Sequence, residues 1–268
     1  MLSTAVATHR QRGARVVATL QDRVALVTGS SRGIGATIAT VFANEGARVV
    51  VHGRDTDAVE TVRSQIAMAG GQAMTCTADL THYQEIEDVR ERIEQVHGPV
   101  DILVANAGGS TTRPSPLEEI NEEAWRAALD GNLTATFLTI KCFLPGMKER
   151  GRGNIITMSS AAARRPHPGS PIAYAAAKAG IELLTKDVAA QAGPSGVRVN
   201  CIAPETIMTE ANQQQIPEHV QQSLRETHPI RRLGTPDDVA QAALFLASDS
   251  AEWITGIVID VAGGSVLV

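Results

Sequence analysis

The sequence predicts one doubly wound α/β domain with a seven-stranded parallel sheet and helices on both faces. From residue 23 onward, short runs rich in β-branched residues alternate with longer helical stretches. Several runs, such as residues 102–105, are apolar throughout. Such strands suit a parallel sheet that is covered on both faces, and the spacing between them fits right-handed crossovers. With 268 residues, the chain has the size of a single domain.

Seven runs are expected to be strands because β-branched residues dominate them and turn residues bound them. They are RVALVTG, RVVVHGR, AMTCTADL, VDILVANAG, GNIITMSS, VRVNCIAP and GIVIDVAGG, which begin at residues 23, 48, 73, 100, 153, 197 and 256. Helices are expected in the gaps. In the helix after the first run, Ile34, Ile38, Val41 and Phe42 share one face toward the sheet.

Two segments are expected to lie outside this pattern. Residues 1–21 contain three arginines and no acid before Asp22, a composition with a faint likeness to a transit peptide. A loosely ordered arm, or an upstream start codon, explains it better. Residues 22–268 then form the domain. Residues 205–232 are rich in glutamine and follow a strand end, so we expect a mobile lid there.

Composition excludes several classes of partner. The net charge is −5 and no long basic block is present, so neither nucleic acid nor an anionic membrane surface is an expected partner. Without a long apolar run or a signal peptide, the protein is expected to be soluble and cytoplasmic. Cys76, Cys142 and Cys201 are expected to be buried, reduced thiols. The seven histidines lack metal-ligand spacing, so no catalytic metal is expected.

A glycine-rich turn follows the first strand, in the stretch TGSSRGIG at residues 28–35. Gly29 suits a tight turn, Gly33 lets the backbone approach a pyrophosphate, and Gly35 lets the next helix pack close to the strand. The amides and partial positive charge of that helix N-terminus favour an anion. The order of strand, turn and helix therefore predicts a dinucleotide site.

Tyr174 and Lys178 are four residues apart in the stretch IAYAAAKAG. On a helix they share a face, so both can point into one cleft. A phenol with a pKa of about 10 transfers protons poorly near neutrality. We expect the ammonium of Lys178 to stabilise the phenolate and lower the pKa of Tyr174. Taken alone, the pair would more simply be one tyrosine and one lysine on a surface helix.

Two further polar positions favour a catalytic interpretation. The fifth run ends in Ser159 and Ser160, at the carboxyl edge where ligands of open α/β sheets bind. Asn132 lies among apolar neighbours midway along an expected helix, an uncomfortable place for an amide unless its hydrogen bonds are satisfied. Taken alone, Asn132 could be a satisfied core residue.

In order and context, Asn132, Ser160, Tyr174 and Lys178 resemble the catalytic tetrad of the short-chain dehydrogenase/reductase family. The likeness runs from about Arg23 to Gly264. It implies a Rossmann-type fold and hydride transfer at carbon 4 of nicotinamide, with Tyr174 giving or taking the substrate proton. It also implies that Ser160 binds the substrate oxygen, that Lys178 holds the nicotinamide ribose, and that Asn132 anchors a water chain.

The resemblance extends to residues that would contact the cofactor. It implies that Asp79 contacts the adenine ring, that residues 106–108 line the site after the fourth strand, and that Thr209 holds the nicotinamide end. Turn or cap residues are the alternative. The full set is Gly29, Ser31, Arg32, Gly33, Ile34, Gly35, Arg54, Asp79, Leu80, Asn106, Ala107, Gly108, Tyr174, Lys178, Pro204 and Thr209.

Three positions depart from the family pattern. Thirteen residues separate Ser160 from Tyr174, one more than is usual, which implies a reshaped rim. Glu205 follows Pro204 where glycine is normal, and places a carboxylate close to the nicotinamide pocket. Ala262 stands where aspartate often precedes the glycine pair, and alters a C-terminal turn.

Cofactor choice is predicted from the end of the second strand. Relatives that use NAD carry an acid there, which accepts the ribose hydroxyls and would repel a 2′-phosphate. This chain has Gly53 followed by Arg54, and Arg32 lies in the glycine-rich turn. Guanidinium matches phosphate geometry, so NADP(H) is expected over NAD(H). Either arginine alone could be a solvated charge, and Asp55 and Asp57 could compensate Arg54 instead.

The expected function is therefore NADP(H)-dependent reduction of a carbonyl group or oxidation of a secondary alcohol. Among branches of the family, the chain most resembles the 3-oxoacyl-acyl-carrier-protein reductases, which implies an acyl-thioester substrate. The alternatives are a dehydrogenase of a sugar, polyol or other secondary alcohol, and a scaffold that binds cofactor without catalysis. The resemblance also implies a homotetramer built through the helices that carry Asn132 and Tyr174.

Overall fold

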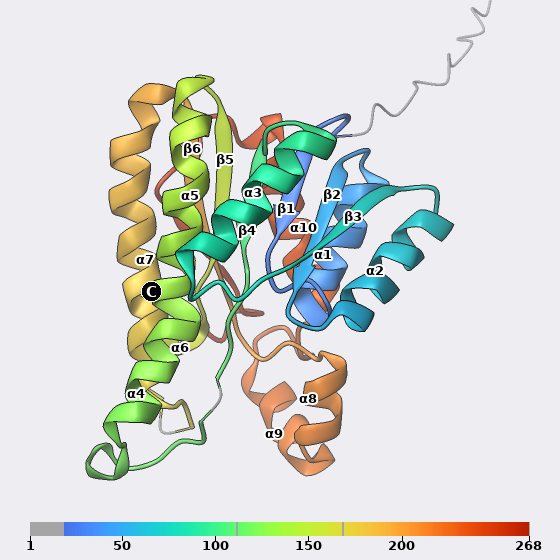
Figure 1. Ribbon diagram of the computed structural model, residues 1–268. Coiled ribbons are helices and arrows are strands. Elements are labelled where there is room, and N and C mark those ends of the chain that lie inside the picture. The colour runs from blue at the N-terminus through green and yellow to red at the C-terminus, as the bar shows by residue number, and fades with distance from the viewer. Residues whose placement is uncertain (1–18, 111, 168, 268) are drawn as a thin grey trace, which may run out of the picture.

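The computed structural model describes residues 19–110, 112–167 and 169–267. Its centre is a seven-stranded sheet in which all neighbouring strands are parallel, in the order β3-β2-β1-β4-β5-β6-β7 (Figure 1). The strands are β1 (Val24–Val27), β2 (Arg48–Gly53), β3 (Gln72–Thr77), β4 (Ile102–Ala105), β5 (Gly153–Met158), β6 (Val197–Pro204) and β7 (Val258–Val261). The predicted fold class is confirmed.

Helices cover both faces of the sheet. One core lies between the sheet and α1, α2 and α10, and a second lies between the sheet and α3, α5 and α7. The helices are α1 (Gly33–Asn44), α2 (Thr56–Met68), α3 (Tyr83–His97), α4 (Glu122–Leu129), α5 (Ala135–Glu149), α6 (Ala161–Arg164), α7 (Ile172–Ala192), α8 (Glu210–Gln215), α9 (Glu218–Thr227) and α10 (Pro236–Ala247).

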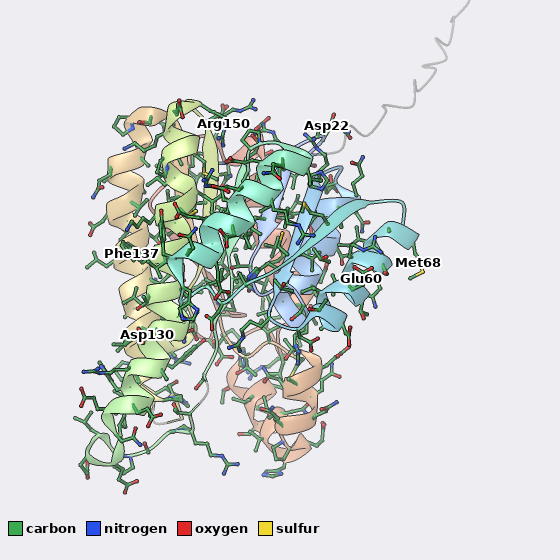
Figure 2. All side chains as sticks on the ribbon, viewed as in Figure 1. Asp22, Glu60, Met68, Asp130, Phe137 and Arg150 are labelled. Atoms are coloured by element: carbon green, nitrogen blue, oxygen red, sulfur yellow. The ribbon has the colours of Figure 1, made fainter. Side chains whose placement is uncertain are left out.

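The apolar pattern of each element explains its position. Strands β1 and β4 are fully buried, which accounts for their apolar runs. Ile38 and Phe42 on α1 have no exposed surface, whereas Met68 at the end of α2 projects into solvent (Figure 2). Burial of a ring such as that of Phe42 is a large contribution, since Phe→Ala in a core costs about 3–5 kcal/mol.

The strand order places the ligand site. Strand β1 pairs with β2 on one side and with β4 on the other. The strands that follow β1 are added on the β2 side, and those that follow β4 are added on the opposite side. A crevice forms at such a switch point, outside the carboxyl ends of the strands. The glycine-rich turn of residues 28–35 lies at this edge, between β1 and α1.

The segment expected to be a lid contains regular structure. Residues 205–232 form α8 and α9, which lie beyond the carboxyl edge of the sheet (Figure 1). A bridge between Ile207 and Gly234 closes the segment at its base. The mobility of this segment stays a prediction.

The start of the domain differs from the expected boundary. Leu20 is 2% exposed and belongs to the core beside α1, and its amide donates to Glu45 O. The domain therefore includes residues that were assigned to the arm of residues 1–21, because an apolar side chain there has core space to fill. Residues 1–18 lie outside the described part of the chain.

Cys76, Cys142 and Cys201 are free and buried. Among the described residues, no helix is long and apolar enough to cross a membrane. The same residues contain no cluster of three or more histidine, cysteine or acidic side chains that could hold a metal ion.

Candidate active site

The glycine-rich turn adopts the geometry that its residues predict. Gly29 and Gly33 have φ of 63° and 55°, a left-handed conformation that glycine adopts without strain. A Cβ at Gly29 would lie 2.8 Å from Ala107 Cα, so the turn also needs glycine for its close approach to the segment after β4. At Gly35, a Cβ would lie 2.6 Å from Asn106 Nδ2.

Thr28 joins the ends of β1 and β4. Its Oγ1 accepts hydrogen bonds from the amides of Asn106 and Ala107, both at 3.0 Å. Asn106 Nδ2 in turn donates to Thr28 O at 3.0 Å and Gly29 O at 3.1 Å. These bonds hold the two sides of the crevice in register. The predicted cofactor residues Asn106 and Ala107 therefore do meet the glycine-rich turn, whereas Gly108 lies against Asn132.

The N-terminus of α1 is open to an anion. Its N-cap residue, Arg32, makes no side-chain capping bond, and the first turn carries no acidic residue. The partial positive charge of the helix end is therefore uncompensated by the chain's own side chains. A pyrophosphate fits this cradle, because the glycines let it reach the backbone amides. Ser31 and Ile34 flank the same turn, and Ile34 also packs against the core.

The predicted phosphate-reading arginines lie at the same edge. Arg32 is 71% exposed at its side chain, with Nη2 3.7 Å from Asp55 Oδ2. An exposed pair at this distance contributes little to stability, so the guanidinium is free to rearrange toward a ligand. Arg54 directly follows β2 and is exposed. Asp55 thus pairs with Arg32, whereas the sequence had suggested Arg54.

Gly53 has a steric role that the sequence did not reveal. A Cβ at this position would lie 2.9 Å from Val59 Cγ1 and 3.1 Å from Ser31 Cβ. Both distances are below ordinary contact, so an acidic side chain cannot enter without a shift of α2 or of the glycine-rich turn. The acid typical of NAD-linked relatives is therefore absent, and the packing around Gly53 would have to adjust to admit one.

Asp79 and Leu80 follow β3 at the carboxyl edge of the sheet. Asp79 Oδ1 accepts from the amide and hydroxyl of Thr81 at 2.9 and 2.8 Å, and these hydrogen bonds lower the pKa of its carboxyl. Leu80 is buried. Asp79 is thus held as a carboxylate at a fixed position, which suits the predicted contact with the adenine ring.

His52, on the neighbouring strand β2, holds the glycine-rich turn through a hydrogen bond from Gly29. The side chain lies inside β2, is 3% exposed, and its Nδ1 accepts from the Gly29 amide at 3.3 Å. Burial lowers the pKa of this imidazole to about 4. The ring is therefore neutral near pH 7, which leaves Nδ1 able to accept. The sequence reasoning missed His52, although one histidine in the apolar run RVVVHG was a visible signal.

Asn132 lies in a π-helical turn, Asp130–Thr134, between α4 and α5. Its Nδ2 donates to Gly109 O at 3.0 Å and to Ala128 O at 2.9 Å, and its Oδ1 accepts from the Gly109 amide at 2.9 Å. The amide thereby fixes the segment after β4. Such π-turns are frequent at functional sites, and the buried amide is satisfied as its context required.

Lys178 is held against the end of β5. The side chain is 4% exposed, and its Nζ donates to Met158 O at 2.9 Å. Burial lowers the pKa of this amine to about 8, so the ammonium still predominates near neutrality. Nζ lies 5.5 Å from the centroid of the Tyr174 ring. The two residues share a face of α7, as their spacing predicted.

The expectation for the pKa of Tyr174 is wrong in this structure. Burial raises that pKa, and a hydrogen bond with Ser160 opposes the rise. The ammonium of Lys178 donates to Met158 O and not to the phenol. The group that stabilises the phenolate of Tyr174 is instead the Ser160 hydroxyl, which was not expected to act on it. The sequence showed the lysine but could not show its orientation.

The two serines after β5 point to different partners. Ser159 is 4% exposed, and its hydroxyl donates to Glu182 Oε1 at 2.8 Å. Ser160 starts α6, where its Oγ accepts from the Ala162 amide at 3.2 Å, and it lies beside Tyr174. Ser159 therefore points into the interior, and Ser160 carries the hydroxyl at the crevice.

The segment after β6 completes the rim. Thr209 caps α8 and its Cγ2 would lie 3.2 Å from a Cβ at Gly33, so this predicted cofactor residue does lie over the glycine-rich turn. Pro204 ends β6 and is buried. The carboxylate of Glu205 accepts from His228 Nε2 at 2.9 Å. This departure from the family pattern is thus tied to the end of α9.

Ala262 is the other departure, and it is buried in a small cluster with Ala161 and Val266. An aspartate in this cluster would lack water, so the alanine suits its surroundings. The extra residue before Tyr174 falls in the loop of residues 165–171, between α6 and α7. Residue 168 of that loop is outside the described part of the chain.

The fold and the open phosphate cradle define a Rossmann-type, dinucleotide-binding oxidoreductase. A family model described as Enoyl-(Acyl carrier protein) reductase matches residues 29–265. The 7alpha-hydroxysteroid dehydrogenase of Escherichia coli (strain K12) is 38% identical over 247 residues, which make up 92% of this chain and 95% of that protein. The chain belongs to the short-chain dehydrogenase/reductase family.

Solved structures agree with this assignment. A 7 alpha-hydroxysteroid dehydrogenase complexed with NADH and 7-oxo glycochenodeoxycholic acid matches with a TM-score of 0.87 and 38% identity, over 92% of this chain and 96% of that one. A 3-oxoacyl-[acyl-carrier protein] reductase with bound NAD from Brucella melitensis matches with a TM-score of 0.87 and 33% identity, over 100% and 99%. The chain is therefore an oxidoreductase of hydroxyl and carbonyl groups that uses a nicotinamide cofactor.

Proposed function

We propose that the protein is an NADP(H)-dependent oxidoreductase that reduces the carbonyl group of a 3-oxoacyl thioester and oxidises the corresponding alcohol. The observation that carries this proposal is the pair of hydroxyls from Tyr174 and Ser160 at the carboxyl edge of the sheet. Tyr174 lies one turn of α7 before Lys178, and the glycine-rich turn leaves the N-terminus of α1 open to a phosphate.

The chain's own residues position the substrate and move the proton. Bound nicotinamide supplies or accepts the hydride at carbon 4. Tyr174 gives its phenolic proton to the carbonyl oxygen during reduction and takes it back during oxidation. Ser160 donates a hydrogen bond to the same oxygen, where charge develops. Lys178, held by Met158 O, can bind the ribose of the cofactor, and Asn132 fixes the β4 side of the crevice.

Three features of the chain support NADP(H). Arg32 and Arg54 are both exposed beside the end of β2, where a 2′-phosphate would lie. At Gly53 the acid that would select NAD is absent, and the packing would have to adjust to admit one. The two solved relatives described above hold NADH and NAD. The proposal of NADP(H) therefore rests on Arg32, Arg54 and Gly53 of this chain, and not on those relatives.

The second candidate substrate is a cyclic secondary alcohol of the hydroxysteroid type. The observation that favours it is the 38% identity to 7alpha-hydroxysteroid dehydrogenase, against 33% for the 3-oxoacyl reductase. A sugar or polyol is a further alternative, suggested by the glutamines of α8 and α9. We also propose a cytoplasmic homotetramer.

A substrate panel tests the proposal. Purified protein is mixed with NADPH, or with NADH, and with 3-oxoacyl thioesters, oxosteroids, cyclic ketones or sugars, and the loss of nicotinamide absorbance is followed. The proposal expects the highest kcat/KM with a 3-oxoacyl thioester and NADPH. A higher value with an oxosteroid would favour the second candidate. No turnover of any compound, despite tight NADPH binding, would favour a non-catalytic scaffold.

A further inference from the structure

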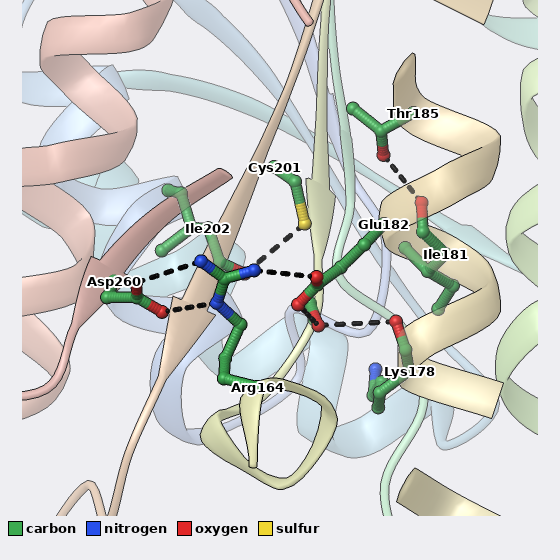
Figure 3. Close-up of polar contacts among 9 residues, drawn as sticks. Arg164, Lys178, Ile181, Glu182, Thr185, Cys201, Ile202 and Asp260 are labelled. Atoms are coloured by element: carbon green, nitrogen blue, oxygen red, sulfur yellow. Dashed lines mark hydrogen bonds and ion pairs between the residues drawn. The ribbon is translucent and has the colours of Figure 1, made fainter. Parts of the chain in front are cut away.

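A partly buried arginine lies between two carboxylates behind the candidate active site. Arg164 Nε and Nη2 donate to Asp260 Oδ1 and Oδ2 at 2.9 and 3.2 Å, and Arg164 Nη1 donates to Glu182 Oε2 at 2.9 Å (Figure 3). The three side chains are only 17%, 21% and 10% exposed, respectively. We call Arg164, Glu182 and Asp260 the clamp. All three donor groups of the guanidinium are used within it.

The clamp joins the segments that carry Ser160, Tyr174 and Lys178. Arg164 ends α6, four residues after Ser160. Glu182 lies on α7, one turn after Lys178, and its Oε1 accepts from the Ser159 hydroxyl at 2.8 Å. The same hydroxyl lies 3.2 Å from Lys178 O. Asp260 lies on β7 and therefore connects the clamp to the central sheet.

Helix α6 needs such an anchor. It has only four residues, far too few to be stable by themselves. The exposed loop that follows it carries the extra residue of this chain, so the loop offers little restraint. Without the clamp, the position of Ser160 would depend on the end of β5 and on the packing of the small Ala161 side chain against Ala262 and Val266.

The chemistry of the clamp also points to a role beyond stability. Even partial removal of charged groups from water costs free energy, and apolar side chains of similar volume often stabilise a buried site at least as well. A bidentate arginine pair, in contrast, holds its partners in one geometry. A group near the reacting atoms benefits from such restraint, since a misplacement of about 1 Å can cost roughly a hundredfold in rate.

We propose that the clamp residues Arg164, Glu182 and Asp260 are positioning residues that hold Ser160 against the phenol of Tyr174. The inference rests on the proposed function only for the roles of Ser160 and Tyr174. Ser160 at the start of α6 and Lys178 on α7 both lie near the Tyr174 ring. Loss of the clamp lets Ser160 move away from Tyr174 and weakens the influence of its hydroxyl, which lowers the pKa of the phenol.

The composition of the chain allows a direct test. Only two tyrosines are present, so Tyr83→Phe leaves Tyr174 as the single phenol. Phenolate absorbance against pH then reports the ionisation of Tyr174 with saturating oxidised cofactor. Ser160→Ala is expected to shift this titration to higher pH. Arg164→Met and Asp260→Asn are expected to shift the titration in the same direction by a smaller amount. The double variant Ser160→Ala/Arg164→Met is expected to shift it no further than Ser160→Ala alone.

Kinetics with the best substrate of the panel give a second readout. Arg164→Met is expected to lower kcat about tenfold or more with little change in cofactor affinity, and Arg164→Lys to recover part of the loss. Arg90→Met is the matched control, because Arg90 also pairs with a carboxylate, Glu94, but on α3, a helix that carries no candidate site residue. It should keep the wild-type rate and titration. If Arg164→Met does not fold, Asp260→Asn, which keeps its size and one acceptor, carries the test.

Two results would overturn the clamp. The first is an unshifted Tyr174 titration in every folded clamp variant while Ser160→Ala shifts it. The second is a uniform rate loss with an unshifted titration, which would show a merely structural role. Failure of the proposed function is separate: it would appear as a near-wild-type rate in Tyr174→Phe, whatever the clamp variants do.

Discussion

Tyr174 is the residue on which the proposed chemistry depends. Tyr174→Phe removes the transferable proton but keeps the ring that packs in α7. We expect the fold and cofactor affinity to persist and kcat to fall by roughly 10²–10⁴-fold, the usual contribution of general acid catalysis. Stopped assays of kcat, cofactor titration and thermal unfolding measure the three quantities. A rate close to wild type would refute the mechanism.

The serine pair gives a second test at the scale of one residue. Ser160 lies beside Tyr174, whereas Ser159 is buried against Glu182. Ser160→Ala should therefore lose much more kcat than Ser159→Ala, which removes only an indirect support. Parallel assays of the two variants decide between the serines. The reverse order of losses would mean that Ser159 faces the substrate.

At the scale of an element, strand β2 supports the glycine-rich turn through His52. The pKa of His52 falls from 6.5 to about 4 in the folded chain, so the unfolded chain binds more protons between these values. The free energy of unfolding should then decline as pH falls from 6.5 toward 4, by up to about 3 kcal/mol. Cofactor affinity should decline as well, because a protonated Nδ1 cannot accept from Gly29.

His52→Asn is the control for this pH dependence. Its Oδ1 can accept near the place of Nδ1, and the amide does not titrate. Urea unfolding at several pH values should show a smaller loss between pH 6.5 and 4 in the variant than in the wild type. Equal losses in both proteins would place the acid sensitivity elsewhere.

The loops after β1 and β2 should set cofactor choice. If each charge-assisted contact to a 2′-phosphate contributes roughly 1.5–3 kcal/mol, Arg32→Ala or Arg54→Ala should weaken NADPH binding on the order of ten- to a hundredfold. NADH binding should change little. Affinities of both cofactors for the three proteins test this. A wild-type preference for NADH, or equal losses for both cofactors, would show that the arginines do not read the phosphate.

The usual way to reverse such a preference is not open in this chain. An acid at Gly53 would collide with Val59 and Ser31, so Gly53→Asp would disturb α2 and the glycine-rich turn together. Loss of NADPH binding in that variant would not distinguish charge from packing. The arginine variants are the cleaner experiment, because both side chains are exposed.

At the scale of the whole molecule, apolar side chains remain exposed on the helices that carry the candidate site. Phe137 on α5 and Leu183 on α7 are 45% and 61% exposed (Figure 2 labels Phe137). Burial of such a surface between copies would fit the homotetramer that the family resemblance implies. Light scattering should give four times the 28.3 kDa chain mass, and a monomer at micromolar concentration would reject the prediction.

A charged side chain at this surface should dissociate the assembly. Phe137→Asp with Leu183→Asp places two carboxylates where apolar contacts are expected, so the mass should fall. Met68→Asp is the control, because Met68 is 82% exposed on α2, away from these helices. It should leave the mass unchanged.

The sequence by itself determined the fold class and the order of the strands along the chain, and it supplied the candidate site residues. The spacing of apolar residues and the composition are enough for these predictions. Apolar runs such as residues 102–105 need helices packed on both faces, and glycines after a strand allow a phosphate to approach the backbone. The four-residue spacing of Tyr174 and Lys178 likewise placed them on one helix face, because that relation is local.

Only the tertiary structure decided how those side chains are used. Lys178 reaches Met158 O from another element, so burial and Ser160, rather than the lysine, govern the pKa of Tyr174. The choice of Ser159 for the interior, the pairing of Asp55 with Arg32, and the joining of Arg164, Glu182 and Asp260 all depend on residues distant in the chain. Hydrogen bonds and desolvation act over a few ångströms of space, and sequence separation does not encode that distance.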